Sequence, residues 1–307
     1  MTLTLGKKNM SDLVTYVGNC LIGGDDFTEY PDGSRTRDVI RLNLNGRHLV
    51  LRQNRDFIRN RGTQDVKGSF VSVTTFHFGE ADEADIPELL DLSNKLCELL
   101  SFVTESRVIA YGHDFPAEGA IRQRQSVIGT VETFRPPFTV FDGSAIKNFI
   151  EQCFLPFLQH RDARGLHVVF DCLYHAGKTG SAIEVQLASL FILLENLKHS
   201  YALQNGYPMI NGFFRNIGAT NAAPGGKLTF ETLLNSMFAA VGMNPNMIQI
   251  IRLRNELIHS GLIAIDAQAK FALFEEIQDI IREYILRLLQ FSGNYHCYSL
   301  GNSKTLP

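Results

Sequence analysis

Hydrophobic and polar residues alternate through much of the chain before residue 135, which is the pattern of strands that bury one face. Residues 39–44 and 48–51 alternate on either side of Asn45-Gly46. Asn-Gly between two such runs is a strong hairpin signal, because both residues accept the positive φ angles of a type I′ turn. Three more strands are predicted at residues 69–76, 106–111 and 126–134. We therefore expect a mixed sheet with at least one helix across it.

The period of the pattern changes after Arg135-Pro136-Pro137-Phe138. A proline pair interrupts both helices and strand ladders, so we place a boundary there. Apolar residues then recur at helical spacing. After the boundary, helices are predicted at residues 145–159, 165–175, 181–204, 229–241, 244–261 and from Asp266 onwards, and one further helix is predicted before it, at residues 87–102. The tail from Asn294 is polar, and we expect it to be frayed.

These patterns predict an α+β fold in three parts. Residues 1–135 form a β-rich domain, residues 136–180 form connecting helices, and residues 181–307 form an all-α bundle. The helix at residues 181–204 is apolar nearly all round. Such a helix is typical of the centre of a bundle or of a dimer interface.

The segment from Asn244 to Gly261 carries the signals of one complete helix. Asn244 suits the N-cap, and Pro245 suits the first helical position, where no amide hydrogen is needed. Gly261 suits the residue after the helix, and His259 lies in the last turn, where a cation is favoured. The predicted inner face contains Met247, Ile250, Ile251, Leu257 and Ile258. Arg254 lies in the middle of this face, where an arginine is costly unless another group pairs with it.

Composition limits the classes of function. The chain of 307 residues is 45% hydrophobic and 20% charged, with a net charge of −3, so nothing attracts it to nucleic acid overall. Its five cysteines have neither disulfide-framework nor metal spacing, which favours a reducing compartment. We find no secretory signal and no apolar run of membrane-spanning length. A cytoplasmic protein without a membrane partner is expected.

Two motifs have simpler explanations than a binding site. Gly177-Lys178-Thr179 resembles the end of a phosphate-binding loop, but Cys172 stands where the motif needs a glycine, so a turn between helices is favoured. Five arginines crowd one hairpin and the loop after it, namely Arg47, Arg52, Arg55, Arg59 and Arg61. With Phe57 they could track phosphates, but a charge run is more often a solvated face. No motif for a metal or a cofactor is present, and neither is expected.

Arg254-Asn255 followed by His259, late in a helix of a C-terminal bundle, resembles the signature of the HEPN superfamily. The resemblance covers residues 181–291. A β-rich part followed by such a bundle is also similar in layout to ApeA-like anti-phage defence proteins. An arginine and a histidine with four to six residues between them occur at least three more times, at Arg41–His48, Arg107–His113 and Arg161–His167. Only the copy at Arg254 lies in a predicted capped helix, with its arginine on the inner face.

The resemblance implies metal-independent cleavage of RNA, in which the 2′-hydroxyl attacks the adjacent phosphate. It implies that Arg254 stabilises the phosphorane, that His259 is the acid or base, and that Asn255 orients them. Residues five apart lie about 140° apart on an ideal helix, so a distorted last turn or a two-fold dimer would be needed to bring the two side chains together. HEPN ribonucleases are typically dimeric, so the resemblance implies a homodimer with a composite site. The β-rich part would then be a sensor or substrate-positioning module in anti-phage defence.

The alternative interpretation is structural. Arg254 would pair with Glu195, which interrupts an apolar run of the helix at residues 181–204, and His259 would cap its own helix. The protein would then be a non-catalytic dimerisation, RNA-binding or protein-binding module. Both interpretations are compatible, because Glu195 could also position Arg254 for catalysis. Neither identifies the RNA that is cut, the trigger, or the ligand of the β-rich part.

Overall fold

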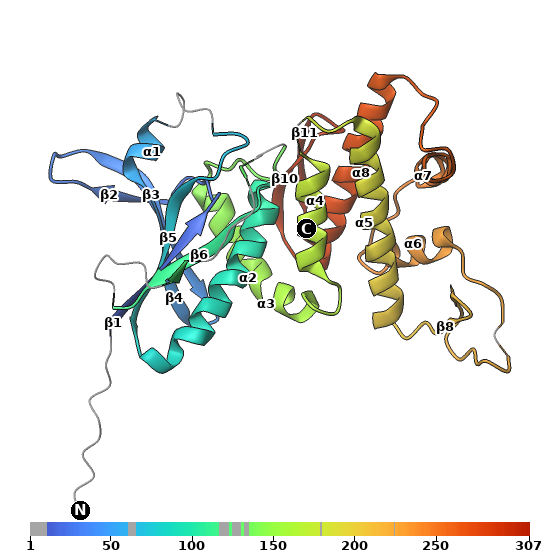
Figure 1. Ribbon diagram of the computed structural model, residues 1–307, viewed down its shortest axis with the longest axis horizontal. Coiled ribbons are helices and arrows are strands. Elements are labelled where there is room, and N and C mark those ends of the chain that lie inside the picture. The colour runs from blue at the N-terminus through green and yellow to red at the C-terminus, as the bar shows by residue number, and fades with distance from the viewer. Residues whose placement is uncertain are drawn as a thin grey trace, which may run out of the picture. The chain divides into compact units, whose positions relative to one another are not determined.

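The computed structural model describes residues 11–60, 66–116, 123–124, 130–131, 135–178, 180–223 and 225–307 (Figure 1). As predicted, the chain is an α+β protein with a sheet and several helices. It divides into two compact units, Met1–Glu151 and Gln152–Pro307. The division falls inside α3 (Gly143–His160), within the stretch predicted to connect the two main parts.

The N-terminal unit is built on one seven-stranded sheet. Its strands are β1 (Ser11–Gly18), β2 (Asp26–Glu29), β3 (Arg35–Leu44), β4 (Arg47–Gln53), β5 (Ser72–Ala81), β6 (Ile109–Asp114) and β7 (Gln123–Arg124). They lie in the order β2-β3-β4-β5-β1-β6-β7. We predicted a mixed sheet, but all the ladders between these strands are antiparallel. The connections β2–β3 and β3–β4 are hairpins, which are too short for the crossover that a parallel pair needs.

The hairpin predicted at Asn45-Gly46 is confirmed as the turn between β3 and β4, with φ angles of 53° and 84°. The strands predicted at 69–76 and 106–111 correspond to β5 and β6, which begin at Ser72 and Ile109. The strand predicted at 126–134 lies largely outside the described residues.

Alternation along the strands gives the sheet two different faces. Ile40, Leu51 and Phe76 point to the buried face, which belongs to the core of this unit. The predicted helix at 87–102 is confirmed as α2 (Ile86–Thr104), and it packs against β1, β5 and β6. A short 3₁₀ turn, η1 (Glu83–Asp85), precedes α2, and α1 (Arg55–Asn60) follows β4. Successive side chains of a strand point to opposite faces. Arg52 and Tyr16 directly follow the buried Leu51 and Thr15, so they lie on the other face of the sheet.

The C-terminal unit is a bundle arranged around one central helix. Besides the end of α3, it contains α4 (Leu166–Ala176), α5 (Ile183–Gln204), α6 (Phe230–Ala239), α7 (Ile248–Ser260) and α8 (Ala267–Leu288). As predicted, Asp266 caps α8, since its side chain accepts a hydrogen bond of 2.9 Å from the amide of Ala269. Helix α5 contacts α4, α6, α7 and α8, so the nearly all-apolar helix is central within a single chain (Figure 1).

We had predicted that this part of the chain is all-helical, and that prediction was wrong. It also contains two hairpins, β8 (Met209–Ile210) with β9 (Phe213–Phe214), and β10 (Gly293–Cys297) with β11 (Asn302–Leu306). The tail predicted to be frayed is therefore the hairpin β10–β11. Its polar residues are held by acidic side chains of α8, because Glu283 accepts a hydrogen bond of 2.9 Å from the hydroxyl of Tyr295 and another from Lys304.

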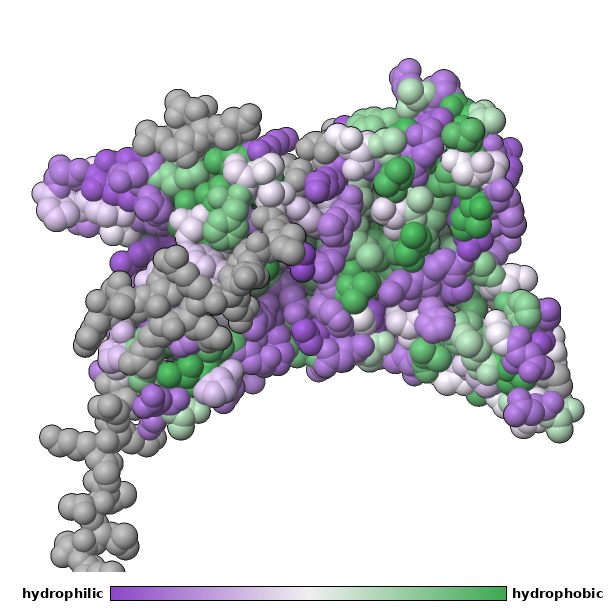
Figure 2. Space-filling view, viewed as in Figure 1, coloured by the Kyte–Doolittle hydropathy of each residue, from purple (hydrophilic) through white to green (hydrophobic). Residues whose placement is uncertain are grey.

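No helix among the described residues is long and apolar enough to cross a membrane. Figure 2 shows hydrophobic residues interspersed with polar ones on the face of the C-terminal unit turned to the viewer. Exposed apolar side chains of this unit include Val185 and Ile192 on α5 and Ile248 and Ile258 on α7.

Candidate functional site

Helix α7 carries the three residues of the predicted site. It begins at Ile248 rather than at Asn244 and Pro245, so our predicted cap was wrong. The side-chain oxygen of Asn246 accepts a hydrogen bond of 3.3 Å from the amide of Ile248, so the polar residue closest to the helix serves its first turn. The helix ends as predicted, since Gly261 has a φ of 73° and closes the last turn with a backbone hydrogen bond.

The buried face of α7 also differs from the prediction. Ile250, Leu253 and Leu257 are buried, at the helical spacing of three and four residues. Ile258, which we had placed on the inner face, is 55% exposed. Arg254 directly follows the buried Leu253, and successive residues of a helix point about 100° apart. Arg254 therefore lies at the edge of the apolar stripe rather than in its centre. Its side chain is 20% exposed.

Three neighbours fix the orientation of the Arg254 guanidinium. Nη2 forms an ion pair with Glu195 of α5, the partner that the structural interpretation named. Nη1 donates a hydrogen bond of 2.8 Å to Oδ1 of Asn255. The guanidinium carbon lies 4.6 Å from the ring centroid of Phe230 on α6. Nε is buried and has no hydrogen-bond partner among the described residues, so the fixed group keeps one unused donor.

Glu195 is shared between two cations. Its other carboxylate oxygen accepts a hydrogen bond of 2.7 Å from Lys198, one turn later on α5. The Lys198 ammonium lies 5.3 Å from the ring centroid of Phe230, the same ring that Arg254 covers. Two cations facing one carboxylate leave one positive charge in this group, and cations over aromatic faces are stabilised further.

The structure does not bring His259 to Arg254 within one chain. The imidazole is exposed and has no hydrogen-bond partner among the described residues. Helix α7 is regular through Ser260, so no distortion turns His259 toward Arg254. Asn255, however, is four residues before His259 and so lies on the same face, about 6 Å away between Cβ atoms. Arg254 donates to Asn255, and Asn255 shares a face with His259, so we call these three side chains the polar strip of α7.

Sequence reasoning missed a basic and aromatic surface beside this strip. We define it as Lys198, His199, Phe213, Lys227 and Phe230, together with Phe214, which is itself buried and contacts the ring of His199. The rings of His199 and Phe214 lie 5.1 Å apart, and the ammonium of Lys227 lies 3.6 Å from the ring centroid of Phe213. These residues come from α5, β9, the loop before α6 and α6 itself. The local signal was the basic and aromatic run Phe213-Phe214-Arg215, which hydrophobic periodicity does not single out.

The other candidate motifs are largely occupied by structural contacts. Arg47 donates to Glu88 at 2.8 Å, and Arg55 pairs with Asp32, which also lies 4.0 Å from Arg59. For Arg47, Arg55 and Arg59 these contacts agree with a solvated face rather than a phosphate-tracking patch. Arg52 has no such partner among the described residues, and Arg61 lies outside them.

The stretch Gly177-Lys178-Thr179 falls between α4 and α5, where we expected a turn. Gly177 closes α4 with a backbone hydrogen bond of 3.0 Å to Leu173. Thr179 itself is outside the described residues.

Among the residues that the structure describes, no group of three or more His, Cys, Asp or Glu side chains is arranged to hold a metal ion. Comparisons of the chain with family models, with curated proteins and with solved structures found no match.

Proposed function

We propose that the protein is a metal-independent endoribonuclease acting in anti-phage defence, with a HEPN-like bundle after a β-rich sensor or substrate-positioning part. The observation that carries the proposal is the strip on α7. Arg254 is held in one orientation by Glu195 and Asn255, and Asn255 lies one turn before the exposed His259.

The chemistry follows from these three groups. An imidazole changes its protonation near neutral pH, so His259 can take the proton of the RNA 2′-hydroxyl or protonate the leaving oxygen. The 2′-oxygen bonds to phosphorus, the bond to the 5′-oxygen breaks, and the products are a 2′,3′-cyclic phosphate and a 5′-hydroxyl. Arg254 stabilises the negative charge of the phosphorane, and its fixed orientation avoids reorganisation during the reaction.

A homodimer would complete the site. In one chain Arg254 and His259 lie about 140° apart on α7, which is too far for both to contact the same phosphate directly. The outward face of α7 carries exposed apolar side chains at Ile248 and Ile258 on either side of Asn255, and Leu262 just beyond the helix is also exposed. A second copy docked on this face would bury these side chains and add a second His259.

The basic and aromatic surface supports RNA as the substrate. Cations that attract phosphates and aromatic rings on which bases stack are the usual parts of a single-strand binding surface. Lys198 and Phe230 contact Arg254 or its partner Glu195, so a strand held there would pass beside the proposed catalytic arginine.

The test is RNA cleavage at neutral pH in excess chelator. Wild type should release fragments that end in a 2′,3′-cyclic phosphate, and His259→Ala should abolish the cleavage while leaving the fold intact by circular dichroism. The matched control is His167→Ala, because His167 is also an exposed helical histidine that follows an arginine. The proposal fails if wild type cuts no RNA, or if both histidine variants cut equally well.

The ion pair between Arg254 and Glu195 favours a second candidate, a non-catalytic binding module in which Arg254 is structural. In that case Arg254→Lys would lower the stability, because a lysine cannot donate to Glu195 and Asn255 in the same fixed geometry. His259→Ala would then change neither stability nor RNA binding. A catalytic Arg254 predicts instead that Arg254→Lys binds RNA but cuts it much more slowly.

A further inference from the structure

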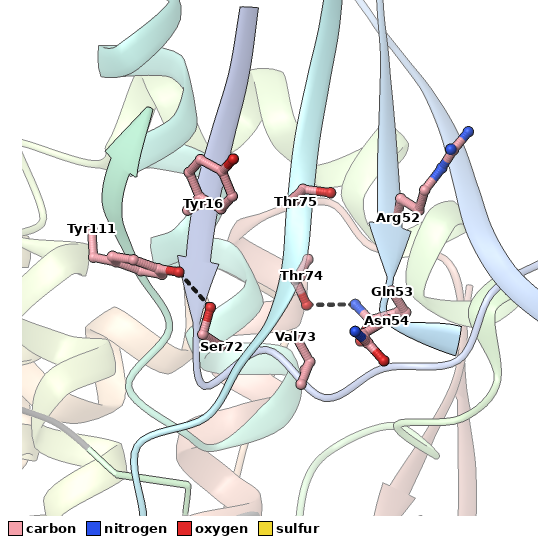
Figure 3. Close-up of a pocket in the computed structure, with 9 residues that line it drawn as sticks. All are labelled: Tyr16, Arg52, Gln53, Asn54, Ser72, Val73, Thr74, Thr75 and Tyr111. Carbon is pink, nitrogen blue, oxygen red and sulfur yellow. Dashed lines mark hydrogen bonds between the residues drawn. The ribbon is translucent and has the colours of Figure 1, made fainter. Parts of the chain in front are cut away.

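A hollow of about 330 Å³ lies on the more exposed face of the sheet in the N-terminal unit (Figure 3). Thr75 of β5 stands at its centre. In the strand register Thr75 is opposite Arg52 of β4 on one side and opposite Tyr16 of β1 on the other. The three side chains therefore form a row across neighbouring strands, and Tyr16 and Arg52 are about 10 Å apart at the backbone.

One side of the hollow is aromatic. The rings of Tyr16 and Tyr111 lie 6.1 Å apart, and the edge of Phe70 meets Tyr111 at 5.6 Å. A Cβ at Gly18 would overlap the ring of Phe70, so this glycine lets Phe70 lie against β1. The Tyr111 hydroxyl is hydrogen-bonded to Ser72. Rings fixed in this way can stack on a ligand without a further loss of side-chain entropy.

The Tyr16 hydroxyl donates a hydrogen bond of 2.7 Å to Asp114. That hydrogen bond and burial raise the pKa of Tyr16 to about 12, so the ring is uncharged at neutral pH. Asp114 itself is buried and does not line the hollow.

The opposite side carries an exposed cation. Arg52 has no ion-pair or hydrogen-bond partner among the described residues, whereas Arg47, on the same strand, is paired with Glu88. The described lining contains no carboxylate, so the charge of Arg52 is not neutralised within the hollow. Figure 3 shows Tyr16 and Tyr111 on one side, Arg52 on the other, and Thr75 between them. A ligand that matches both sides has a flat ring and an anionic group.

One further side chain of the lining can bond a ligand. Asn54 is exposed, and its Oδ1 already accepts a hydrogen bond of 3.0 Å from the amide of Phe57, so its amide nitrogen is the group left to donate. Gln53 and Thr74, one residue along the strands from Arg52 and Thr75, are buried and bonded to each other at 2.6 Å, so their side chains belong to the other face of the sheet. A sugar or base with an acceptor oxygen or nitrogen suits Asn54.

We propose that this hollow binds a nucleotide unit, with the base against Tyr16 and Tyr111 and the phosphate on Arg52. Its volume is at the lower end of the range of about 300–1,000 Å³ for small-molecule sites, which suits one nucleotide. The unit comes either as a free nucleotide or as part of a single RNA strand. The site lies in the N-terminal unit and uses none of the residues of the proposed ribonuclease centre.

The experiment measures binding to the full-length protein by calorimetry, with AMP, adenosine, inorganic phosphate and an eight-nucleotide 2′-O-methyl RNA as probes. The methylated RNA has no free 2′-hydroxyl to attack the phosphate, so its binding is separable from any cleavage. We expect AMP to bind more tightly than adenosine or phosphate alone. Tighter binding of the RNA than of AMP would identify a strand as the source, and the reverse would identify a free nucleotide.

Variants locate the site. Arg52→Gln should weaken the binding of AMP about tenfold, because one charge-assisted contact is lost, whereas Arg47→Gln on the same strand should not. Tyr111→Leu should weaken binding at least about fivefold, and Tyr111→Phe, which keeps the ring, should bind like wild type. The proposal is overturned if no probe binds at millimolar concentration, if the two arginine variants behave alike, or if phosphate binds as tightly as AMP.

Discussion

Replacing Glu283 by alanine tests whether α8 holds the C-terminal hairpin through one buried carboxylate. Glu283 accepts hydrogen bonds from Tyr295 at 2.9 Å, from Arg287 at 2.8 Å and from Lys304. Its side chain is 10% exposed, and those of Arg287 and Lys304 are 24% and 41% exposed. The loss should therefore be dominated by the buried tyrosine, with smaller contributions from the two partly solvated cations.

The magnitude follows from these exposures. Leaving the buried hydroxyl of Tyr295 without a partner costs about 1–3 kcal/mol. Each of the partly exposed ion pairs adds about 0.5 kcal/mol, because solvent screens it. We expect Glu283→Ala to lower the local unfolding free energy by about 2–4 kcal/mol. Hydrogen exchange of the β10–β11 amides measures this quantity directly, which matters because a chain of two units need not unfold in one step.

The matched control is Glu88→Ala, which removes the exposed partner of Arg47. It should change stability by less than about 0.5 kcal/mol. The reasoning is refuted if the β10–β11 amides of Glu283→Ala exchange no faster than those of the wild type. It is also refuted if the two variants lose the same free energy.

The same carboxylate predicts a pH dependence. Burial raises the pKa of Glu283, but hydrogen bonds from Lys304, Tyr295 and Arg287 outweigh it and hold the pKa below its ordinary value of 4.5. A lowered pKa in the folded state gives a stabilisation that is complete above pH 4.5 and lost as the pH falls through the folded-state pKa. The stability difference between wild type and Glu283→Gln should therefore shrink between pH 5 and more acidic solutions, as followed by exchange of the same amides.

Three further predictions concern α7 and its partner. Leu253→Ala should lower the free energy of urea unfolding by about 2–5 kcal/mol because Leu253 is buried, whereas Ile258→Ala should lower it by less than about 0.5 kcal/mol. Equal losses would show instead that Ile258 is buried, as the sequence pattern had predicted. Gly261→Ala should cost about 1 kcal/mol in thermal unfolding, because its φ of 73° is unfavourable for a side chain, and an unchanged melting temperature would contradict this. Glu195→Gln should tighten RNA binding in a filter assay, since one negative charge is removed; weaker binding would refute it.

The sequence correctly predicted those turns and helix caps that depend only on residues close together in the chain. The Asn45-Gly46 turn and the Asp266 cap were found because each depends on residues that are adjacent in sequence. The start of α7 was missed because several polar residues compete for the cap, and only packing selects between Asn244 and Asn246. The hairpin β10–β11 was missed because the carboxylate that holds its polar residues lies on another element.

In the candidate site, too, some residues could be predicted from the sequence and others could not. Arg254 and Glu195 were proposed as partners because each interrupts an apolar pattern, and the structure pairs them. Lys198 and Phe230 gave no such signal, since a lysine and an aromatic residue are ordinary at helical positions. The hollow on the sheet was not predicted either. Its residues come from strands that are adjacent only after pairing, and pairing registers are not visible in a single sequence.

Glu195 has a consequence for how the C-terminal unit would respond to an approaching polyanion. Its two oxygens already satisfy Arg254 and Lys198, the same two cations that a phosphate would seek. The carboxylate is thus an internal competitor, and an incoming phosphate must displace it from at least one cation before it gains a direct contact. If the proposed RNA binding holds, a small anion would therefore bind weakly here, whereas a strand with several neighbouring contacts would compensate for the displaced carboxylate.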